Sequence, residues 1–271
     1  MAANLLLAIR RFRVLLCDML SWSIKLFRIA GIRLEVHATF FLLLAYVGWE
    51  GWTEAGGTGL FWRVLTISAF FVCVVLHELG HSFTARGYGV GISRILLMPI
   101  GGMAEFDSLP RAPRKELLIT LAGPAVNFVL AALLWWPVAH MPDTIYFYSF
   151  NGLIYQLLIA NLVMGVFNLV PVFPMDGGRI LRALLATRYP YLKATKIAAT
   201  VGKVFAVIGI LVMLFWLDSV LGALLFTFIL FAGEAEYRAV KRREVEDAHW
   251  RQMLERFYGR PPDRPIINVT E

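Results

Sequence analysis

The stretch Phe70–Gly89, FFVCVVLHELGHSFTARGYG, places His77, Glu78 and His81 in the middle of otherwise apolar sequence. The two histidines are four residues apart, so on a helix they lie one turn apart on one face and can bind one Zn²⁺ together. Glu78 then stands beside them as the general base for a water that the metal activates. The spacing predicts a zinc-binding helix, and a histidine pair hydrogen-bonded inside a helix bundle is the alternative interpretation.

The composition is that of a membrane protein. Of the 271 residues, 59% are hydrophobic, and the mean hydropathy is +0.67, outside the usual range of soluble proteins. Cys17 and Cys73 are too few to suggest a disulfide framework or a cysteine-built zinc site. The net charge of +7 has two readings, a nucleic-acid-binding surface or the charged flanks of membrane spans.

Apolar runs long enough to cross a bilayer are read as transmembrane helices. Six such runs occur, at about 37–50, 62–83, 116–138, 150–171, 199–217 and 219–233. Lys and Arg gather in 1–36, 84–118, 174–198 and 233–271, and the intervening loops hold none. This distribution predicts that both termini are cytoplasmic, and it argues against a nucleic-acid-binding surface. His81 then lies inside the membrane but shallow, about 7 Å of helix from Arg86.

We expect three parts: a cytoplasmic amphipathic N-terminal segment (1–36), a transmembrane domain that contains the histidine motif (37–233) and a cytoplasmic charged helix and tail (234–271). Basic and apolar residues interleave at helical spacing in the first part, which predicts a helix on the membrane surface, with an organelle transit peptide as the weaker alternative. The charged helix is either a partner-binding element or a solvated terminal helix.

A third metal ligand should be an acid or a histidine at the same membrane depth. By topology, His140 lies on the outer side and His249 in the cytoplasmic tail. Asp176, in FNLVPVFPMDGGRILRALL (167–185), follows the fourth predicted span at its cytoplasmic end, after two prolines have ended the helix. Irregular backbone at this depth is tolerated where it lines a cavity. Asp176 is therefore the candidate ligand, and a helix N-cap is its alternative role.

Four elements together resemble one family. HELGH in a membrane segment, followed about 95 residues later by NLVPVFPMDGGR, resembles the site-2 protease family of intramembrane zinc metalloproteases. LAGPAVNF (121–128) resembles the family's G-P-x-x-N element, and ILLMPIGGMAEF (95–106) its Gly-Gly element after the zinc helix. The resemblance covers about 65–185 and is to a compact form of the family, without PDZ or CBS domains.

The resemblance implies that His77, His81 and Asp176 bind one Zn²⁺ and that Glu78 is the general base. It also implies a catalytic role for Asn127, in positioning substrate or stabilising the oxyanion, with an interhelical hydrogen bond as the alternative. Gly101, Gly102 and Asn168 are expected to bind substrate, Asn168 also by shaping the Asp176 loop. Asn161 is assigned to packing, and the roles of His37 and Cys73 stay open.

The expected fold is an all-α polytopic membrane protein with about six transmembrane helices and a small re-entrant β-hairpin near the zinc site. The expected activity is hydrolysis of peptide bonds in transmembrane segments of membrane-protein substrates near the cytoplasmic face, in a bacterial or archaeal cell membrane. A free hairpin edge could pair with an unwound substrate segment; a simple re-entrant loop is the alternative. The expected partners are the substrate, the bilayer and a further copy or a regulatory protein, and no nucleic acid. The alternatives are an inactive membrane adaptor and a metal transporter.

Overall fold

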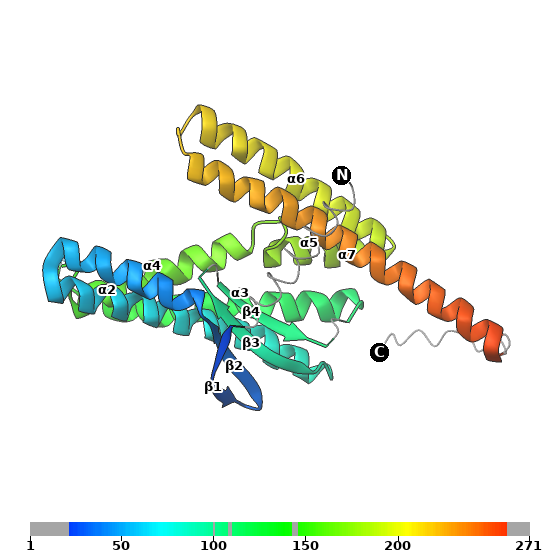
Figure 1. The fold of residues 1–271 in the computed structure, drawn as a ribbon, viewed down its shortest axis with the longest axis horizontal. Coiled ribbons are helices and arrows are strands. Elements are labelled where there is room, and N and C mark those ends of the chain that lie inside the picture. The colour runs from blue at the N-terminus through cyan, green and yellow to red at the C-terminus, as the bar shows by residue number, and fades with distance from the viewer. Residues whose placement is uncertain (1–21, 100, 108–109, 143–145, 259–271) are drawn as a thin grey trace, which may run out of the picture. The chain divides into compact units, whose positions relative to one another are not determined.

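The computed structural model describes residues 22–99, 101–107, 110–142 and 146–258. The chain divides into two compact units, Met1–Val170 and Pro171–Glu271. The first unit contains β1 (Ser23–Ile29), β2 (Ile32–His37), α2 (Thr39–Gly87), β3 (Ile92–Met98), β4 (Gly101–Phe106), α3 (Pro113–Ala139) and α4 (Phe150–Asn168). The second contains α5 (Asp176–Ala186), α6 (Tyr191–Phe215) and α7 (Val220–Tyr258) (Figure 1).

The described helices agree with the predicted spans. Five of them, α2, α3, α4, α6 and α7, are long and apolar enough to cross a membrane. Because α2 has non-helical backbone at Ala55 and Gly56, it consists of two helical halves. The described part of the chain therefore has six long apolar helical segments, and the predicted fold class is confirmed.

The two halves of α2 run back along each other (Figure 1). Gly56 has a φ of 59°, a conformation that glycine adopts without strain. Glycines also allow the two backbones to approach closely: a Cβ on Gly51 would lie 2.5 Å from the carbonyl oxygen of Gly59. Because the chain reverses direction, the second half of α2 runs antiparallel to the first half. The second half carries the histidine motif and extends beyond the start of the first half.

A four-stranded sheet, in the order β1-β2-β3-β4, packs beside this second half of α2. β1 and β2 are antiparallel, β2 and β3 parallel, and β3 and β4 antiparallel. The whole of α2 is the crossover connection that a parallel pair of strands requires. The shared core is made by Leu34, Val36, Ile95 and Leu97 of the sheet with Phe71, Val74, Val75 and Leu79 of α2.

Two sequence predictions concern this sheet. The hairpin expected at 95–106 is present as β3 and β4, but it is half of a larger sheet, and Gly101 and Gly102 begin β4 instead of forming the turn. The helix predicted for the N-terminal segment 1–36 is wrong over 23–36, most of which lies in β1 and β2. β2 gains a long-range partner in β3, which outweighs its local helical pattern. Residues 1–21 lie outside the described part.

An ion triad ties three strands together on the sheet face opposite α2. Arg94 of β3 donates to Glu35 of β2 at 2.8 Å and to Glu105 of β4 at 2.7 Å. Burial acts to raise the pKa of Glu35, but hydrogen bonds from Arg94 and Ser23 outweigh burial and hold this pKa below the ordinary value. The hydrogen bond from Arg94 likewise lowers the pKa of Glu105. Both carboxylates are therefore ionised at neutral pH.

In the second unit, α5 and the loop before it pack on the helix pair α6 and α7. Phe173 is 1% exposed and contacts Ala198 and Ala199 of α6. Arg182 of α5 is 2% exposed and donates to Glu236 of α7 at 2.7 Å. α7 continues without a break from its apolar part into the charged helix predicted after residue 233.

The contact between the halves of α2 generates a prediction. Gly51→Ala should lower the free energy of unfolding by about 1–3 kcal/mol, because the new methyl group overlaps the backbone of Gly59. Gly57→Ala, in the same helix, meets nothing within 4 Å and is the matched control. Melting temperatures in detergent measure both variants. Equal melting temperatures would contradict the close packing of the halves.

Candidate metal centre

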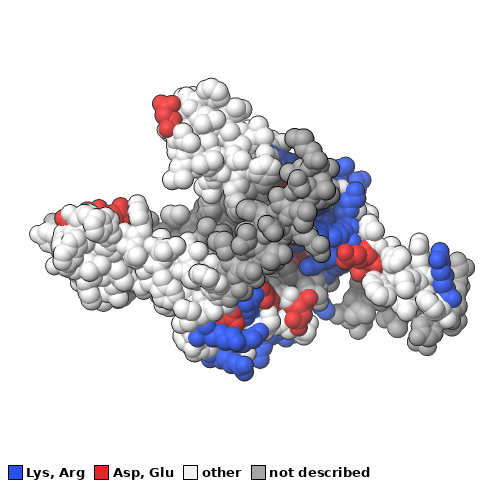
Figure 2. Space-filling model, viewed as in Figure 1, with Lys and Arg blue, Asp and Glu red and all other residues white. Residues whose placement is uncertain are grey.

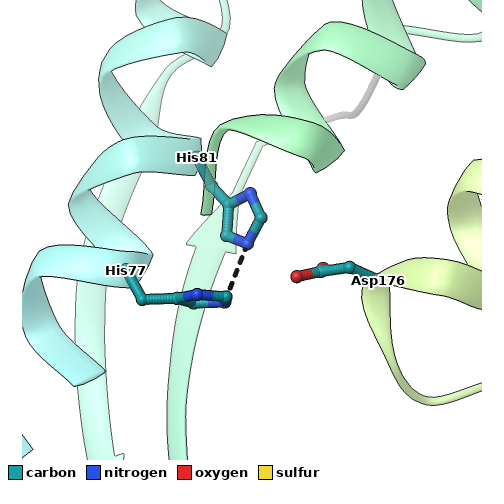
Figure 3. A group of neighbouring side chains, drawn as sticks. All are labelled: His77, His81 and Asp176. Carbon is teal, nitrogen blue, oxygen red and sulfur yellow. Dashed lines mark hydrogen bonds between the residues drawn. The ribbon is translucent and has the colours of Figure 1, made fainter. Parts of the chain in front are cut away.

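The histidine motif lies on the second half of α2, where α3 comes closest. A Cβ on Gly80 would lie 2.8 Å from the carbonyl oxygen of Ala122, so the two backbones are in direct contact at the motif. His77 and His81 are 5% and 7% exposed, respectively. Their Nε2 atoms face each other at 3.1 Å (Figure 3).

Each imidazole is held through its other nitrogen. Nδ1 of His81 lies 2.8 Å from the carbonyl oxygen of Ile119, and a carbonyl oxygen can only accept. The proton of neutral His81 is therefore on Nδ1, and its Nε2 carries a lone pair.

His77 reaches the same state through two buried asparagines. Nδ2 of Asn161 donates to the carbonyl oxygen of Leu157 at 2.8 Å, which leaves Oδ1 of Asn161 to accept from Nδ2 of Asn127 at 3.0 Å. Oδ1 of Asn127 then faces Nδ1 of His77 at 2.6 Å and must accept a proton from it. Nε2 of His77 therefore also carries a lone pair.

Two facing lone pairs suit a cation between them. Two zinc ligands at about 2.0–2.1 Å and a tetrahedral angle are about 3.3 Å apart, close to the 3.1 Å between the Nε2 atoms. Histidines that bind a metal usually donate their other ring N–H to an amide or carbonyl oxygen, as both do here. The geometry fits a metal site and argues against a merely hydrogen-bonded pair.

Glycines keep the space around this pair open. A Cβ on Gly123 of α3 would lie 2.2 Å from Nε2 of His81 and 2.8 Å from Cε1 of His77. A Cβ on Gly102 of β4 would lie 2.8 Å from Cγ of the half-buried Glu78. The Gly-Gly element of β4 thus lies directly against the carboxylate next to the first histidine. Gly123 is the glycine of the G-P-x-x-N pattern. The sequence alone does not show that this position requires a residue without a side chain.

Asp176 occupies the first turn of α5, and its N-cap residue is Met175. The N-cap alternative for Asp176 is therefore wrong. The preceding loop is fixed by tight contacts, since a Cβ on Gly178 would lie 2.6 Å from the backbone nitrogen of Phe173. The guanidinium of Arg182 stacks on the ring of Phe173 at 5.3 Å.

His77, His81 and Asp176 form a group that could hold a metal ion. Each offers one ligand atom, and these atoms lie within 4.8 Å of one another, as neighbouring side chains in Figure 3. The donor set, two imidazoles and a carboxylate, is one that zinc accepts in catalytic sites.

The other residues singled out in the sequence have distinct positions. Asn127 is fully buried and uses both ends of its amide on His77 and Asn161. Asn161 takes part in this chain of hydrogen bonds and also donates to Sγ of the buried Cys73 at 3.4 Å. His37 contacts the hydroxyl of Thr39 at 2.7 Å. Asn168 is half-buried at the end of α4.

Comparisons with known proteins match this chain to a family of peptidases. The model of peptidase family M50 matches residues 65–147 and 137–209, more than half of the chain. A zinc metalloprotease of Methanocaldococcus jannaschii is 45% identical over 82% of this chain and 62% of its own length. Stage IV sporulation protein FB of Bacillus subtilis is 30% identical over 69% of this chain and 62% of its own length. The chain thus spans about six tenths of each of these relatives.

A solved structure supports the fold as well. The structure described as the site-2 protease from Methanocaldococcus jannaschii has a TM-score of 0.58 and 43% sequence identity to this chain. The match covers 80% of this chain and 95% of the other.

The space beside the two histidines leads to one prediction. Gly123→Ala should abolish metal binding, because its methyl group would overlap Nε2 of His81. Gly87→Ala, which meets nothing within 4 Å, is the control in the motif helix. Metal content of the purified variants by mass spectrometry, alongside their melting temperatures, checks this. A folded Gly123→Ala protein with a full metal complement would contradict the close approach of Gly123 to His81.

The hydrogen bonds that link Asn161, Asn127 and His77 lead to a second prediction. Asn161→Leu removes the group that orients Asn127, so the affinity for Zn²⁺ should fall roughly 10- to 100-fold. The buried amide of Asn127 also loses its acceptor, which should lower stability by about 1–3 kcal/mol. Asn151→Leu, at the other end of α4, is the matched control. Competition with a zinc chelator measures the affinity, and an unchanged value in Asn161→Leu would contradict the role of Asn161.

Proposed function

This chain belongs to peptidase family M50, and from that premise we propose that it is an intramembrane zinc endopeptidase. In this proposal it hydrolyses peptide bonds within transmembrane segments of membrane-protein substrates, near the cytoplasmic face. The observation that carries it is the pair of imidazole Nε2 atoms at 3.1 Å, both with the proton on the other nitrogen, beside a glutamate. The zinc metalloprotease names of the relatives support it.

His77, His81 and Asp176 would hold one Zn²⁺. When bound, zinc polarises the substrate carbonyl and increases the acidity of a water. The chain's own residues supply the remaining chemistry. Asn127 and the carbonyl of Ile119 keep both imidazoles in the tautomer that binds a metal. Because Asn127 uses both ends of its amide, we assign it a positioning role and not contact with the substrate.

Glu78 would act as the general base. It follows His77 directly in α2, is half-buried, and lies against Gly102 of β4. Its carboxylate takes a proton from the attacking water while the water oxygen bonds to the substrate carbonyl carbon. The same group then gives this proton to the leaving amine as the C–N bond breaks. Glu78 is therefore a carboxylate again at the end of the reaction, with no net gain or loss of a proton.

Substrate must arrive in an extended form, since the carbonyls of a transmembrane helix are hydrogen-bonded internally. β4 is an edge strand of the sheet, and an extended segment can add to such an edge. At Gly102 this strand lies next to Glu78. We therefore propose that Gly101 and Gly102 bind the unwound substrate segment. Asn168 is proposed as a further substrate-binding residue.

The proposed topology has six spans and both termini in the cytoplasm of a bacterial or archaeal cell. It rests on the positions of Lys and Arg, which flank the apolar helices in 1–36, 84–118, 174–198 and 233–271. The boundaries at 36/37 and 233/234 remain part of this proposal. A further copy of the chain or a regulatory protein is the proposed additional partner.

Glu78→Gln tests the function. The variant should keep its zinc, because no ligand changes, and should lose cleavage of a co-expressed single-span substrate by at least about 100-fold. Glu246→Gln, on the exposed part of α7, is the matched control. Cleavage is read as the appearance of a shorter fragment on an immunoblot, and zinc by elemental analysis. Unchanged cleavage in Glu78→Gln, or no zinc in the wild-type protein, would refute the protease.

A further inference from the structure

Arg182 is a buried charged side chain on the same short helix as Asp176. It is 2% exposed, although arginine is almost never fully buried unless it is paired. Asp176 is the first residue of α5, and Arg182 lies near the middle of the same helix. At 3.6 residues per turn, these two side chains leave the helix about 120° apart. Arg182 can therefore hold α5 from one side without occupying the side on which Asp176 projects.

The guanidinium of Arg182 contacts three segments outside α5. Its Nη1 donates to Oε1 of Glu236 in α7 at 2.7 Å. Its Cζ lies 5.3 Å from the ring centroid of Phe173, in the loop before α5, and 5.1 Å from that of Tyr191, the first residue of α6. A helix of 11 residues is marginal on its own, so packing decides where it lies. The contacts of this one side chain therefore help to set the position of α5.

The contact with Phe173 places Asp176 between two fixed points. Phe173 precedes Asp176 in the loop, is 1% exposed and packs on α6. The first turn of α5 lies tightly against the same residue, since a Cβ on Gly178 would be 2.6 Å from the backbone nitrogen of Phe173. Arg182 therefore holds the chain before Asp176, through Phe173, and also after it, through α5 itself.

A buried ion pair is by itself weak evidence for stability. Taking two charges out of water is costly, and apolar residues of similar volume often stabilise a core equally well. The best attested role of such a pair is to fix one arrangement of the chain. The planar guanidinium also stacks on aromatic rings, which a compact ammonium group does not do. The pair of Arg182 and Glu236 is thus suited to setting a position.

A second ion pair at the same level of α7 offers a comparison. Lys203 of α6 donates to Glu234 of α7 at 2.5 Å. Figure 2 shows the part of α6 and α7 next to their connection free of Lys and Arg, in agreement with the sequence over 204–233. The Lys203 pair joins the two long helices to each other. The Arg182 pair instead joins α7 to the helix that carries Asp176.

We propose that Arg182 is a positioning residue for the metal ligand Asp176. By tying Phe173 and α5 to α7, it holds the Asp176 carboxylate in place before the metal binds, so that less conformational entropy is lost on binding. This inference rests on the proposed function, in which Asp176 binds zinc. It goes beyond that function by making Glu236 of α7 a determinant of the affinity for zinc.

The zinc affinity of the full-length protein in detergent, measured by competition with a chelator, tests the proposal. Arg182→Met removes the charge and the hydrogen bond while keeping an unbranched side chain, and its affinity for zinc should fall roughly tenfold. Glu236→Gln keeps an acceptor for Arg182 and should lower the affinity by a smaller factor. Lys203→Met breaks the other ion pair and is the matched control, which should bind zinc like wild type.

Two further measurements separate positioning from a general loss of stability. In an Asp176→Ala background, Arg182→Met should have no further effect on zinc affinity, because Arg182 acts through the Asp176 carboxylate. The absorption spectrum of the Co²⁺-substituted protein reports the geometry of the ligands. It should change in Arg182→Met and stay unchanged in Lys203→Met, even where the melting temperatures of the two metal-free proteins fall by the same amount.

The inference and the proposed function fail in different ways. Equal zinc affinity in Arg182→Met and wild type, equal losses in Arg182→Met and Lys203→Met, or an undiminished effect in the Asp176→Ala background would each overturn the inference alone. If Arg182→Met does not fold, Glu236→Gln changes no volume and serves in the same three comparisons. Absence of zinc from the wild-type protein would overturn the proposed peptidase together with this inference.

Discussion

Two backbone carbonyl oxygens decide the protonation of the histidine motif, and the proposed chemistry depends on them. The carbonyl of Ile119 sets His81 directly. The carbonyl of Leu157 determines the tautomer of His77 indirectly. It accepts a hydrogen bond from Asn161 and so orients that amide, Asn161 in turn orients the amide of Asn127, and Asn127 accepts the proton of the His77 imidazole. Backbone carbonyls cannot change role, so both Nε2 atoms keep their lone pairs. A site of this kind is prepared for a metal by the fold of one unit, before the third ligand is considered.

The space that a metal site needs explains why small residues gather at the histidine motif. A metal site needs the histidine helix close to its supporting helix and yet open at the ligand atoms. Gly80 meets the first need by bringing the backbones of α2 and α3 together, and Gly123 meets the second by leaving room at His81. A side chain at either position would break one requirement while satisfying the other. Helix packing and site chemistry are therefore set by the same few glycines.

Much of the architecture could be predicted because its signals are local. Apolar runs of sufficient length predict the spans, and the i, i+4 histidines predict the metal-binding face. β1 and β2 could not be predicted, because the partner of β2 is β3, more than fifty residues later in the chain. Asn161 was assigned to packing for a similar reason. A single asparagine in an apolar helix has no pattern, and its role follows only from what lies opposite it in space.

The ion triad of Glu35, Arg94 and Glu105 has a consequence for how the sheet aligns. Parallel strands whose residues alternate between two faces can slip, and a slip of one residue would turn Glu35 toward the apolar core beneath α2. Arg94 reaches both carboxylates only in the observed alignment. The triad therefore fixes the register between β2 and β3, the strands that precede and follow α2 in the chain. By locking β3, it also locks the height of β4, and so sets which residue of that strand stands beside Glu78.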